Sequence, residues 1–164
     1  MAITLARIDD RVIHGQTVTR WAASRPCNAI LVISDKVAAD ELRKKVLKAA
    51  AGALKLGIYT VEQGVAALEK AKSSPKSFFI ISDSVEEFAN LKRKGGDFGD
   101  VLNVGNLSGT REGTKNLGHA VCITDEDVSA FDYLESQGVK LQFQMTPEDG
   151  VKTWADYKAK YESA

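Results

Sequence analysis

Seven short runs rich in β-branched and aromatic residues recur along the chain, and each has the composition of a β-strand. Several of them are continuously apolar, which is typical of strands covered by helices on both faces. The predicted strands occupy residues 2–8, 29–34, 54–59, 77–82, 101–105, 120–124 and 139–145. Segments with helical periodicity separate them, and this alternation predicts βαβ units in a mostly parallel sheet.

The segments between the strands repeat apolar residues at helical spacing, so each predicted helix has one apolar face for the sheet. These stripes consist of Leu42, Val46 and Ala49 or Ala50; Val61, Val65 and Leu68; Val85, Phe88 and Leu91; and Val128, Phe131 and Leu134. The candidate N-cap residues are Asp83 or Ser84 and Thr124 or Asp125. A last helix is expected to start at Pro147 and to dock through Val151, Trp154 and Tyr161.

Together these elements predict one three-layer α/β/α domain over residues 1–164, with a doubly wound, mostly parallel sheet of about seven strands. The length of 164 residues is usual for one domain, and no linker, internal repeat or low-complexity segment interrupts it. Ligands of such folds bind beyond the carboxyl ends of the strands, near a topological switch point. The residues that follow the first strand are therefore the first candidates for a site.

The composition argues against several classes of protein. The 22 Lys and Arg residues balance the 22 Asp and Glu residues, so no general attraction to nucleic acid or anionic lipid is expected. No apolar stretch approaches the ~20 residues that cross a bilayer, and the first residues lack the pattern of an export signal. We therefore expect a cytoplasmic protein without direct membrane insertion, in which Cys27 and Cys122 remain thiols.

The segment RIDDRVIHGQ, from Arg7 to Gln16, places His14 between the first predicted strand and a helix expected to start at Gly15 or Gln16. Imidazole has an ordinary pKa of about 6.5, so it can act as a nucleophile at neutral pH without an activating base. Arg7 and Arg11 carry forked donors that match phosphate oxygens. The helix start leaves N–H groups free for an anion, and Gly15 permits close backbone approach. These features favour phosphoryl chemistry at His14.

The two aspartates of this segment need a different explanation, because a carboxylate repels phosphate. One of them is expected to orient Arg11 or to accept the imidazole N–H of His14, which would fix the attacking ring nitrogen. Asp9 is the better candidate for this role. Asp10 could equally well cap a turn.

Other chemistries find less support in the residues. The second histidine, His119, belongs to no metal-ligand motif and is expected at a strand edge. No GxSxG motif occurs, and the glycines of residues 104–118 fit no nucleotide-binding pattern. Asn106 and Ser108 could still donate hydrogen bonds at the same sheet edge, although an ordinary glycine-rich loop is an equal alternative. The residues alone leave open a phosphocarrier, a small hydrolase with His14 as general base, and a phosphate-binding regulatory module.

RIDDRVIHGQ closely resembles the phosphorylation-site segment of the IIB components of the mannose/fructose/sorbose class of the bacterial sugar phosphotransferase system. The likeness continues in order and spacing over essentially the whole chain. It includes AILVISDKVAADELRKKVLKAAA, VEQGVAALEKA, LNVGN and AVCITDEDVSAFDYLESQGVKLQFQMTPED.

This resemblance implies that His14 accepts a phosphoryl group on Nδ1 from a phosphohistidine of a IIA protein or domain. It further implies transfer to a sugar carried by the membrane subunits IIC and IID, without a metal, a nucleotide or another cofactor. By the same resemblance, Asp9 and Arg11 belong to the active-site loop with His14. The supporting or phosphate-binding candidates are Arg7, Asp10, Gly15, Gln16 and Arg43.

The family that this chain resembles has a doubly wound sheet with a late antiparallel strand, so such a strand is expected here. The chain is also expected to be a free-standing IIB component. The chain departs from the family in residues 50–57, where members usually carry Pro-x-Gly, and the turn there must be built differently. Val12 and Thr17 also replace the more usual Leu and Val. These two changes should leave the chemistry intact, although Thr17 could alter contacts of the loop.

Overall fold

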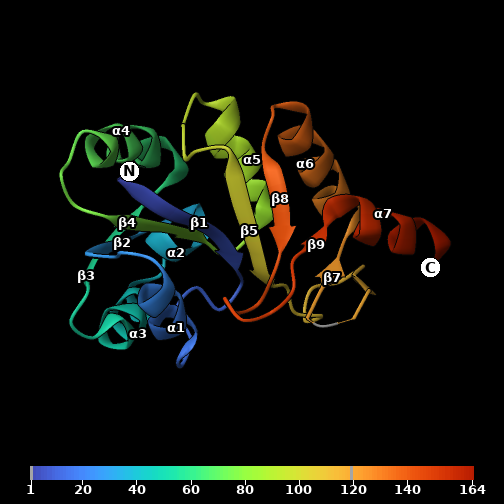
Figure 1. The fold of residues 1–164 in the computed structure, drawn as a ribbon, viewed down its shortest axis with the longest axis horizontal. Coiled ribbons are helices and arrows are strands. Elements are labelled where there is room, and N and C mark those ends of the chain that lie inside the picture. Colours follow the sequence, from blue (N-terminus) through green and yellow to red (C-terminus); the bar gives the residue numbers. More distant parts are fainter. Residues whose placement is uncertain (1, 119) are drawn as a thin grey trace.

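The computed structural model describes residues 2–118 and 120–164, and its central sheet has helices on both faces (Figure 1). Within these ranges the sheet has seven strands, in the order β3-β2-β4-β1-β5-β8-β9. The strands from β3 to β8 are parallel, and β9 runs antiparallel to β8. The predicted α/β sheet with a late antiparallel strand is therefore confirmed. The strand bounds are β1 (Ile3–Asp9), β2 (Ala29–Ile33), β3 (Lys55–Tyr59), β4 (Phe78–Ser82), β5 (Val101–Asn106), β8 (Lys140–Phe143) and β9 (Lys152–Thr153).

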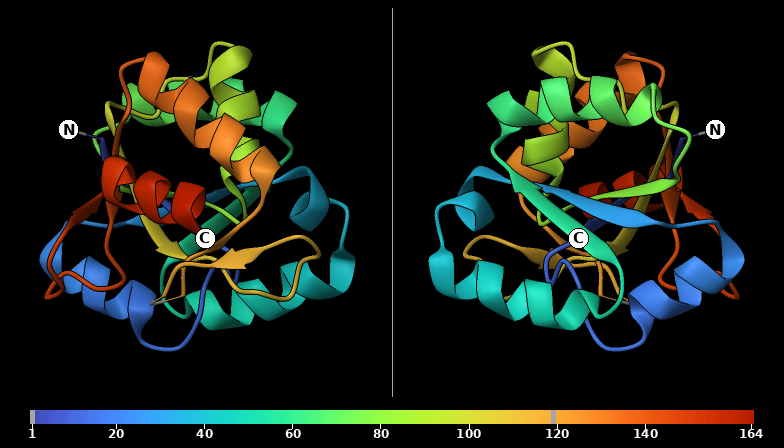
Figure 2. Two further views of the ribbon diagram at one scale, coloured as in Figure 1. Left: turned by 90° about the vertical axis from the view of Figure 1, so that its right-hand side faces the viewer. Right: turned by 90° about the vertical axis from the view of Figure 1, so that its left-hand side faces the viewer.

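The helices form a layer on each side of the sheet (Figure 2). One layer contains α1 (Thr17–Ser24), α2 (Asp35–Ala38) and α3 (Glu41–Ala51); the other contains α4 (Val61–Lys72), α5 (Val85–Arg93), α6 (Asp125–Ser136) and α7 (Trp154–Ser163). In β4, Phe79 and Ile81 pack with the first layer while Ile80 packs with the second. The continuously apolar strands thus serve two cores, as their composition predicts.

The connections between the strands reverse direction beside β1, which lies between β4 and β5. After β1 the chain builds β2, β3 and β4 on one side of β1. After β4 it crosses to the other side of β1 and builds β5 there. Such a reversal is the topological switch point at which α/β folds bind ligands. The loop that follows β1 therefore lies where the sequence places the candidate site.

Two of the predicted helix caps are confirmed by their hydrogen bonds. The side chain of Ser84 accepts from the backbone N–H of Glu87 at 3.3 Å and starts α5. Thr124 and Asp127 form a reciprocal capping box at the start of α6. These caps satisfy backbone donors that the first helical turn would otherwise leave free.

The predicted strand over residues 120–124 is wrong as a member of the central sheet. Only β7 (Cys122–Ile123) is formed there, and it pairs antiparallel with β6 (Lys115–Asn116) in a separate ribbon. Val121 forms one isolated parallel bridge with Leu107, directly after β5, and the run ends at Thr124, which caps α6. The seventh strand of the sheet is instead the short edge strand β9, which the apolar pattern does not mark.

The apolar stripe predicted for α3 is also wrong. Leu42 and Val46 are 74% and 59% exposed, whereas Leu47 and Ala51 are buried against the sheet. The helix carries two apolar stripes, and periodicity alone does not indicate which of them meets the sheet. The side chain of Arg43 reaches the loop after β1, which matches the observed rotation of the helix.

The last helix, α7, starts at Trp154 and not at Pro147. Thr153 and Asp156 form the capping box that begins it, and residues 147–151 are loop. Trp154 and Tyr161 are buried as predicted, but Val151 precedes the helix and is 50% exposed. The helical spacing from Val151 to Trp154 was therefore coincidental.

Candidate functional site

The loop of residues 10–16 connects β1 to α1 at the carboxyl edge of the sheet. Val12 and Ile13 in its middle are 2% and 6% exposed and join the core formed with α1 and α3. Val12 has a φ of 63°, which β-branched residues rarely adopt, and its N–H donates to the carbonyl of Asp9 at 2.8 Å. His14, which directly follows Ile13, is exposed. Two buried side chains thus fasten the loop while the imidazole stays accessible.

Asp9, at the end of β1, is a buried carboxylate that binds two arginines. Its Oδ2 accepts hydrogen bonds from Nη2 of Arg7 and Nη2 of Arg11, each at 3.2 Å. Its Oδ1 accepts from Nε and from the backbone N–H of Arg11, at 3.1 and 3.0 Å. The side chain of Arg11 is 32% exposed, against 2% for that of Asp9. Asp9 therefore fixes the orientation of a guanidinium group that an anion can reach from solution.

Arg7 is buried within the sheet layer and is 1% exposed. Its Nη1 donates to the side-chain oxygen of Asn103 and to the carbonyl of Gln144. Burial lowers the pKa of Arg7, while the charge and hydrogen bond of Asp9 raise it. The residue supports Asp9 from inside, and its guanidinium group does not form part of a basic surface.

Asp10 connects the loop after β1 to the segment after β5. Its Oδ1 accepts from Nδ2 of Asn106 and its Oδ2 accepts from the backbone N–H of Ser108, both at 2.6 Å. Its carbonyl accepts from Nη2 of Arg43 at 2.9 Å. The glycine-rich segment therefore does border the loop of His14, through contacts with Asp10.

Arg43 lies in the first turn of α3, and its side chain is 25% exposed. Besides the carbonyl of Asp10, its guanidinium group faces the carboxylate of Asp83, with Nη1 and Oδ2 3.9 Å apart. The structure thus brings Arg43 to the loop after β1, as the resemblance implies. It leaves a quarter of that side chain open to solvent.

The start of α1 is the second feature of the loop that suits an anion. The helix begins at Thr17, one residue from the predicted start, and the side chain of its N-cap residue Gln16 makes no capping hydrogen bond. Gly15 has a φ of 51° and open space around it, and it precedes this turn. The carbonyl of His14 accepts from the N–H of Thr17 at 3.1 Å. Gly15 and Gln16 are both exposed, beside His14.

Sequence reasoning missed the residues that hold Arg7 and Arg11 from the neighbouring strands. Asn103 and Gly105 belong to β5, and a Cβ atom at Gly105 would overlap the guanidinium group of Arg7. Met145 accepts from Nη2 of Arg11 at its sulfur, at 3.8 Å, and from the indole N–H of Trp21 at its carbonyl, at 3.1 Å. Gly105 was the one signal in the sequence, because a glycine within a strand often marks a place where another group lies close to the backbone.

A further cation that the sequence did not single out lies in the connection between β5 and α6. Arg111 donates to the carboxylate of Asp127 and to the carbonyl of Cys122. The hydrogen bond of Asp127 raises the pKa of Arg111, and the charges of Asp127 and Asp10 add to this effect. Arg111 therefore belongs to the same electrostatic environment as Asp10.

Four other expectations concern metals, membranes, thiols and the second histidine. In the two described ranges, no group of three or more His, Cys, Asp and Glu side chains could hold a metal ion. No helix of these ranges is long and apolar enough to cross a membrane. Cys27 and Cys122 are free thiols. His119, expected at a strand edge, lies outside the described residues.

Comparison with known families and proteins gives matches over nearly the whole chain. The model of the family described as PTS system sorbose subfamily IIB component matches residues 3–164. The sorbose-specific EIIB component of Lacticaseibacillus casei is 35% identical over 150 residues, which are 91% of this chain and 90% of that protein. The mannose-specific EIIAB component of Escherichia coli K12 is 31% identical, and the match covers 91% of this chain but 46% of that longer protein.

Solved structures match as closely in three dimensions. The crystal structure of the IIBSor domain of the sorbose permease from Klebsiella pneumoniae has a TM-score of 0.88 and 32% identity, with 98% of each chain covered. The N-acetylgalactosamine-specific IIB component 1 of Escherichia coli has a TM-score of 0.83 and 27% identity, with 92% of this chain and 98% of that chain covered. The fold and the sequence therefore have the same relatives.

Proposed function

We propose that this chain, which belongs to the sorbose subfamily of IIB components of the phosphotransferase system, carries a phosphoryl group on His14. Membership of the family means that the chain is a phosphotransferase component that takes part in sugar uptake. The observation that supports His14 as the carrier is its exposed position, three residues after a partly exposed arginine whose orientation a buried carboxylate fixes.

In the first step, the lone pair of Nδ1 of His14 attacks the phosphorus of a phosphohistidine on IIA. The new N–P bond forms as the N–P bond of the donor breaks, and the donor imidazole leaves with its electron pair. A neutral imidazole is already a competent nucleophile, so the step needs no activating base. In the second step, the oxygen of a sugar hydroxyl attacks the same phosphorus, and the O–P bond forms as the N–P bond of His14 breaks. The imidazole leaves with the electron pair of that bond, and its nitrogen takes up the hydroxyl proton.

Phosphoryl transfer depends mainly on positioning and on compensation of charge on the equatorial oxygens. Arg11 is suited to this task, because its forked donors match phosphate oxygens and Asp9 restricts their orientation. The free N–H groups at the start of α1 would add a partial positive charge. Gly15 and Gln16 lead into this turn and would allow the backbone to approach the phosphoryl group.

The remaining candidates support the loop and do not need to touch the phosphoryl group. Arg7 neutralises the buried Asp9 from inside the protein. Asp10 connects the loop to the segment after β5 through its two short hydrogen bonds. Arg43 holds the carbonyl of Asp10 and offers a second, partly exposed cation near the loop.

The partners of this cycle are a IIA protein or domain as donor and the membrane subunits IIC and IID as carriers of the sugar. The fused mannose-specific EIIAB relative supports the partnership with IIA, since both functions occur there in one polypeptide. A carrier that exchanges partners needs a weak interface, and surface charges assist fast encounter in such interfaces. The proposed cycle uses no nucleotide, metal or nucleic acid, and it takes place on the cytoplasmic side of the membrane.

Reconstitution of the donor chain tests this function. The protein is incubated with labelled phosphoenolpyruvate, the two general phosphotransfer proteins and a cognate IIA. We expect an acid-labile, base-stable label that is absent from His14→Ala and retained by His119→Ala. Label that persists in His14→Ala would refute the assignment, and so would ester hydrolysis by the protein alone together with no label.

A further inference from the structure

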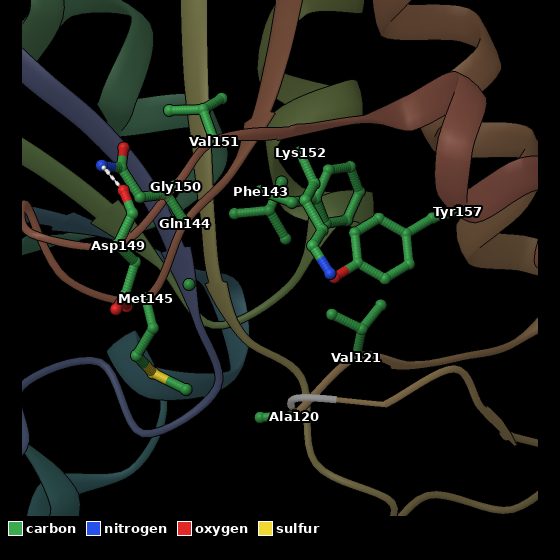
Figure 3. A pocket seen from close by; sticks show the side chains of 12 residues that line it. Ala120, Val121, Phe143, Gln144, Met145, Asp149, Gly150, Val151, Lys152 and Tyr157 are labelled. Carbon is green, nitrogen blue, oxygen red and sulfur yellow. Dashed lines mark hydrogen bonds between the residues drawn. The ribbon is translucent and has the colours of Figure 1, made fainter.

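A cavity of about 610 Å³ lies at the carboxyl ends of β5 and β8, and two residues that line it, Gln144 and Met145, contact the arginines of the candidate site. Its walls come from these strand ends, from the residues that precede β7, and from the segment 144–152 that leads into β9 (Figure 3). Cavities that bind small molecules in proteins commonly have about 300–1,000 Å³. The size and position of this cavity therefore suit a ligand of the size of a monosaccharide derivative.

The cavity has apolar walls that include two aromatic rings. Phe143 and Tyr157 are both 3% exposed, and their ring centroids are 4.6 Å apart. Val121 continues this wall, and Val151 lies at the cavity with half of its surface exposed. Val151 belongs to neither apolar core. Flat aromatic and aliphatic surfaces of this kind can pack against the C–H faces of a sugar ring.

The polar groups of the cavity differ between its two sides. Lys152 and Tyr157 point toward one another on the side next to α7 (Figure 3). Hydrogen bonds from Thr153 lower the pKa of the Asp156 carboxyl group. The positive charges of Lys152 and Lys160 both act on the same group and lower its pKa further. The ammonium group of Lys160 also lies 5.2 Å from the centroid of the Tyr157 ring. Burial, with the charge of Asp156, raises the pKa of Tyr157, so its hydroxyl remains a donor. A cation beside an O–H donor suits a phosphate group.

The other side of the cavity offers hydrogen-bond acceptors. Gln144 donates through Nε2 to the carbonyls of Pro147 and Asp149, so its Oε1 is the side-chain atom that can accept a hydrogen bond from a ligand. Asp149 accepts from the N–H of Thr146 with Oδ2, and its Oδ1 is left for a ligand. An amide oxygen and a carboxylate oxygen are acceptors for sugar hydroxyls.

We propose that this cavity binds a phosphorylated monosaccharide, with its phosphate at Lys152 and Tyr157 and its hydroxyls at Gln144 and Asp149. The inference rests on the proposed function, because a phosphorylated sugar is the product of the transfer from His14. Binding of this product would therefore allow accumulated sugar phosphate to inhibit the chain that helps to form it.

The segment that forms one wall of the cavity also holds the arginines of the candidate site. The carbonyl of Gln144 accepts from Arg7 at 3.2 Å, and Met145 contacts Arg11 through its sulfur at 3.8 Å. Gly105, on another wall, lies directly against the guanidinium group of Arg7. A ligand that shifts either wall changes the support of Asp9 and Arg11. Bound sugar phosphate therefore slows the acceptance of a phosphoryl group by His14.

Calorimetric titration of the full chain with mannose phosphate and with fructose phosphate tests the site. Inorganic phosphate and the free sugars serve as comparison ligands. We expect saturable binding of at least one sugar phosphate, and weaker binding of inorganic phosphate and of each free sugar. Lys152→Gln should weaken binding about tenfold, because it removes one charge-assisted hydrogen bond. Lys55→Gln, the same change at the far edge of the sheet, should leave the affinity unchanged.

Val151→Trp is a second variant that blocks the cavity without disturbing a packed core, since Val151 is half exposed. It should abolish binding while the circular dichroism spectrum remains that of the wild type. The proposal is overturned if no sugar phosphate binds, if inorganic phosphate binds as tightly, or if Lys152→Gln and Val151→Trp bind as well as the wild type.

Labelling of His14 in the presence of saturating sugar phosphate separates this proposal from the proposed function. We expect a slower initial rate for the wild type and no such effect for Val151→Trp, which does not bind the ligand. Normal labelling without sugar phosphate binding overturns the cavity proposal alone. Sugar phosphate binding without any labelling overturns the phosphocarrier function, and with it the interpretation of the ligand as a product.

Discussion

The guanidinium group of Arg7 lies against Gly105 so closely that a Cβ atom at position 105 would overlap it. The two residues belong to the neighbouring parallel strands β1 and β5. The buried Arg7 forms an ion pair with Asp9, and Asp9 also forms an ion pair with Arg11 and fixes its orientation. A glycine in the adjacent strand therefore determines where the partly exposed arginine of the candidate site lies.

Gly105→Ala should lower the free energy of unfolding by about 1–3 kcal/mol, as overpacking of a filled interior does. It should also slow labelling of His14, because Arg7 and Asp9 must move. Urea denaturation and the initial labelling rate measure the two effects. Gly150→Ala is the control for stability, since a Cβ atom there has open space, and it should change stability by less than ~0.5 kcal/mol. A Gly105→Ala protein as stable and as fast as the wild type would contradict this account.

Asp9→Asn should lower the free energy of unfolding by about 3–5 kcal/mol, because it leaves the buried guanidinium group of Arg7 without its counter-ion. Urea denaturation at neutral pH measures the loss. Glu41→Gln removes the acidic partner of Lys44 on the surface of α3, and it should cost less than ~1 kcal/mol. Similar losses in the two variants would mean that the Arg7–Asp9 pair contributes no more than a surface pair.

Arg11→Lys should reduce the initial rate of labelling about tenfold, although the charge is retained, because one hydrogen bond to a charged group is lost. Arginine makes two side-chain hydrogen bonds to Asp9, whereas lysine carries a compact charge without the fork. Single-turnover transfer from phosphorylated IIA measures the rate. Arg93→Lys on α5 is the matched control and should transfer normally. An unchanged rate for Arg11→Lys would show that the arginine has only a structural role.

The parts of the site that the sequence predicted are those that lie close together in the chain. Asp9 is the last residue of β1, and Arg11 and His14 follow it in the loop of residues 10–16. The end of an apolar strand indicates which edge of the sheet presents this loop. Asn103 and Met145 could not be found in this way, because their contacts with the arginines depend on the pairing of β1 with β5 and of β5 with β8.

The same limit explains the errors in the fold. The strands β2 and β4 were predicted because both of their faces are buried and their sequences are almost continuously apolar. The edge strand β9 has two exposed residues, Lys152 and Thr153, and no apolar pattern. In the observed rotation of α3, Leu47 and Ala51 pack in the core while Arg43 contacts the carbonyl of Asp10, and these partners are remote in sequence.

Glu87→Gln should change how stability depends on pH. Burial raises the pKa of Glu87, against the hydrogen bond from the N–H of Asp35, and the charges of Asp35, Asp83 and Glu86 add to the rise. A carboxyl group with a raised pKa favours folding when protonated, and this contribution is lost as pH rises through the folded pKa. Relative to the wild type, Glu87→Gln should therefore gain stability from about pH 4 to pH 7.

Urea denaturation at several pH values measures this gain. The exposed change Glu112→Gln is the control, and we expect it to shift stability by less than ~0.5 kcal/mol at each pH. A stability difference between Glu87→Gln and the wild type that does not vary with pH would contradict the assigned effect of burial.

The most direct test of the central claim is to locate the phosphoryl group after transfer from phosphorylated IIA. Tandem mass spectrometry under conditions that preserve phosphohistidine should place one phosphoryl group on His14, and the addition of the sugar with the IIC and IID subunits should remove it. A phosphoryl group on any other residue, or one on His14 that the complete system does not transfer to the sugar, would contradict the account.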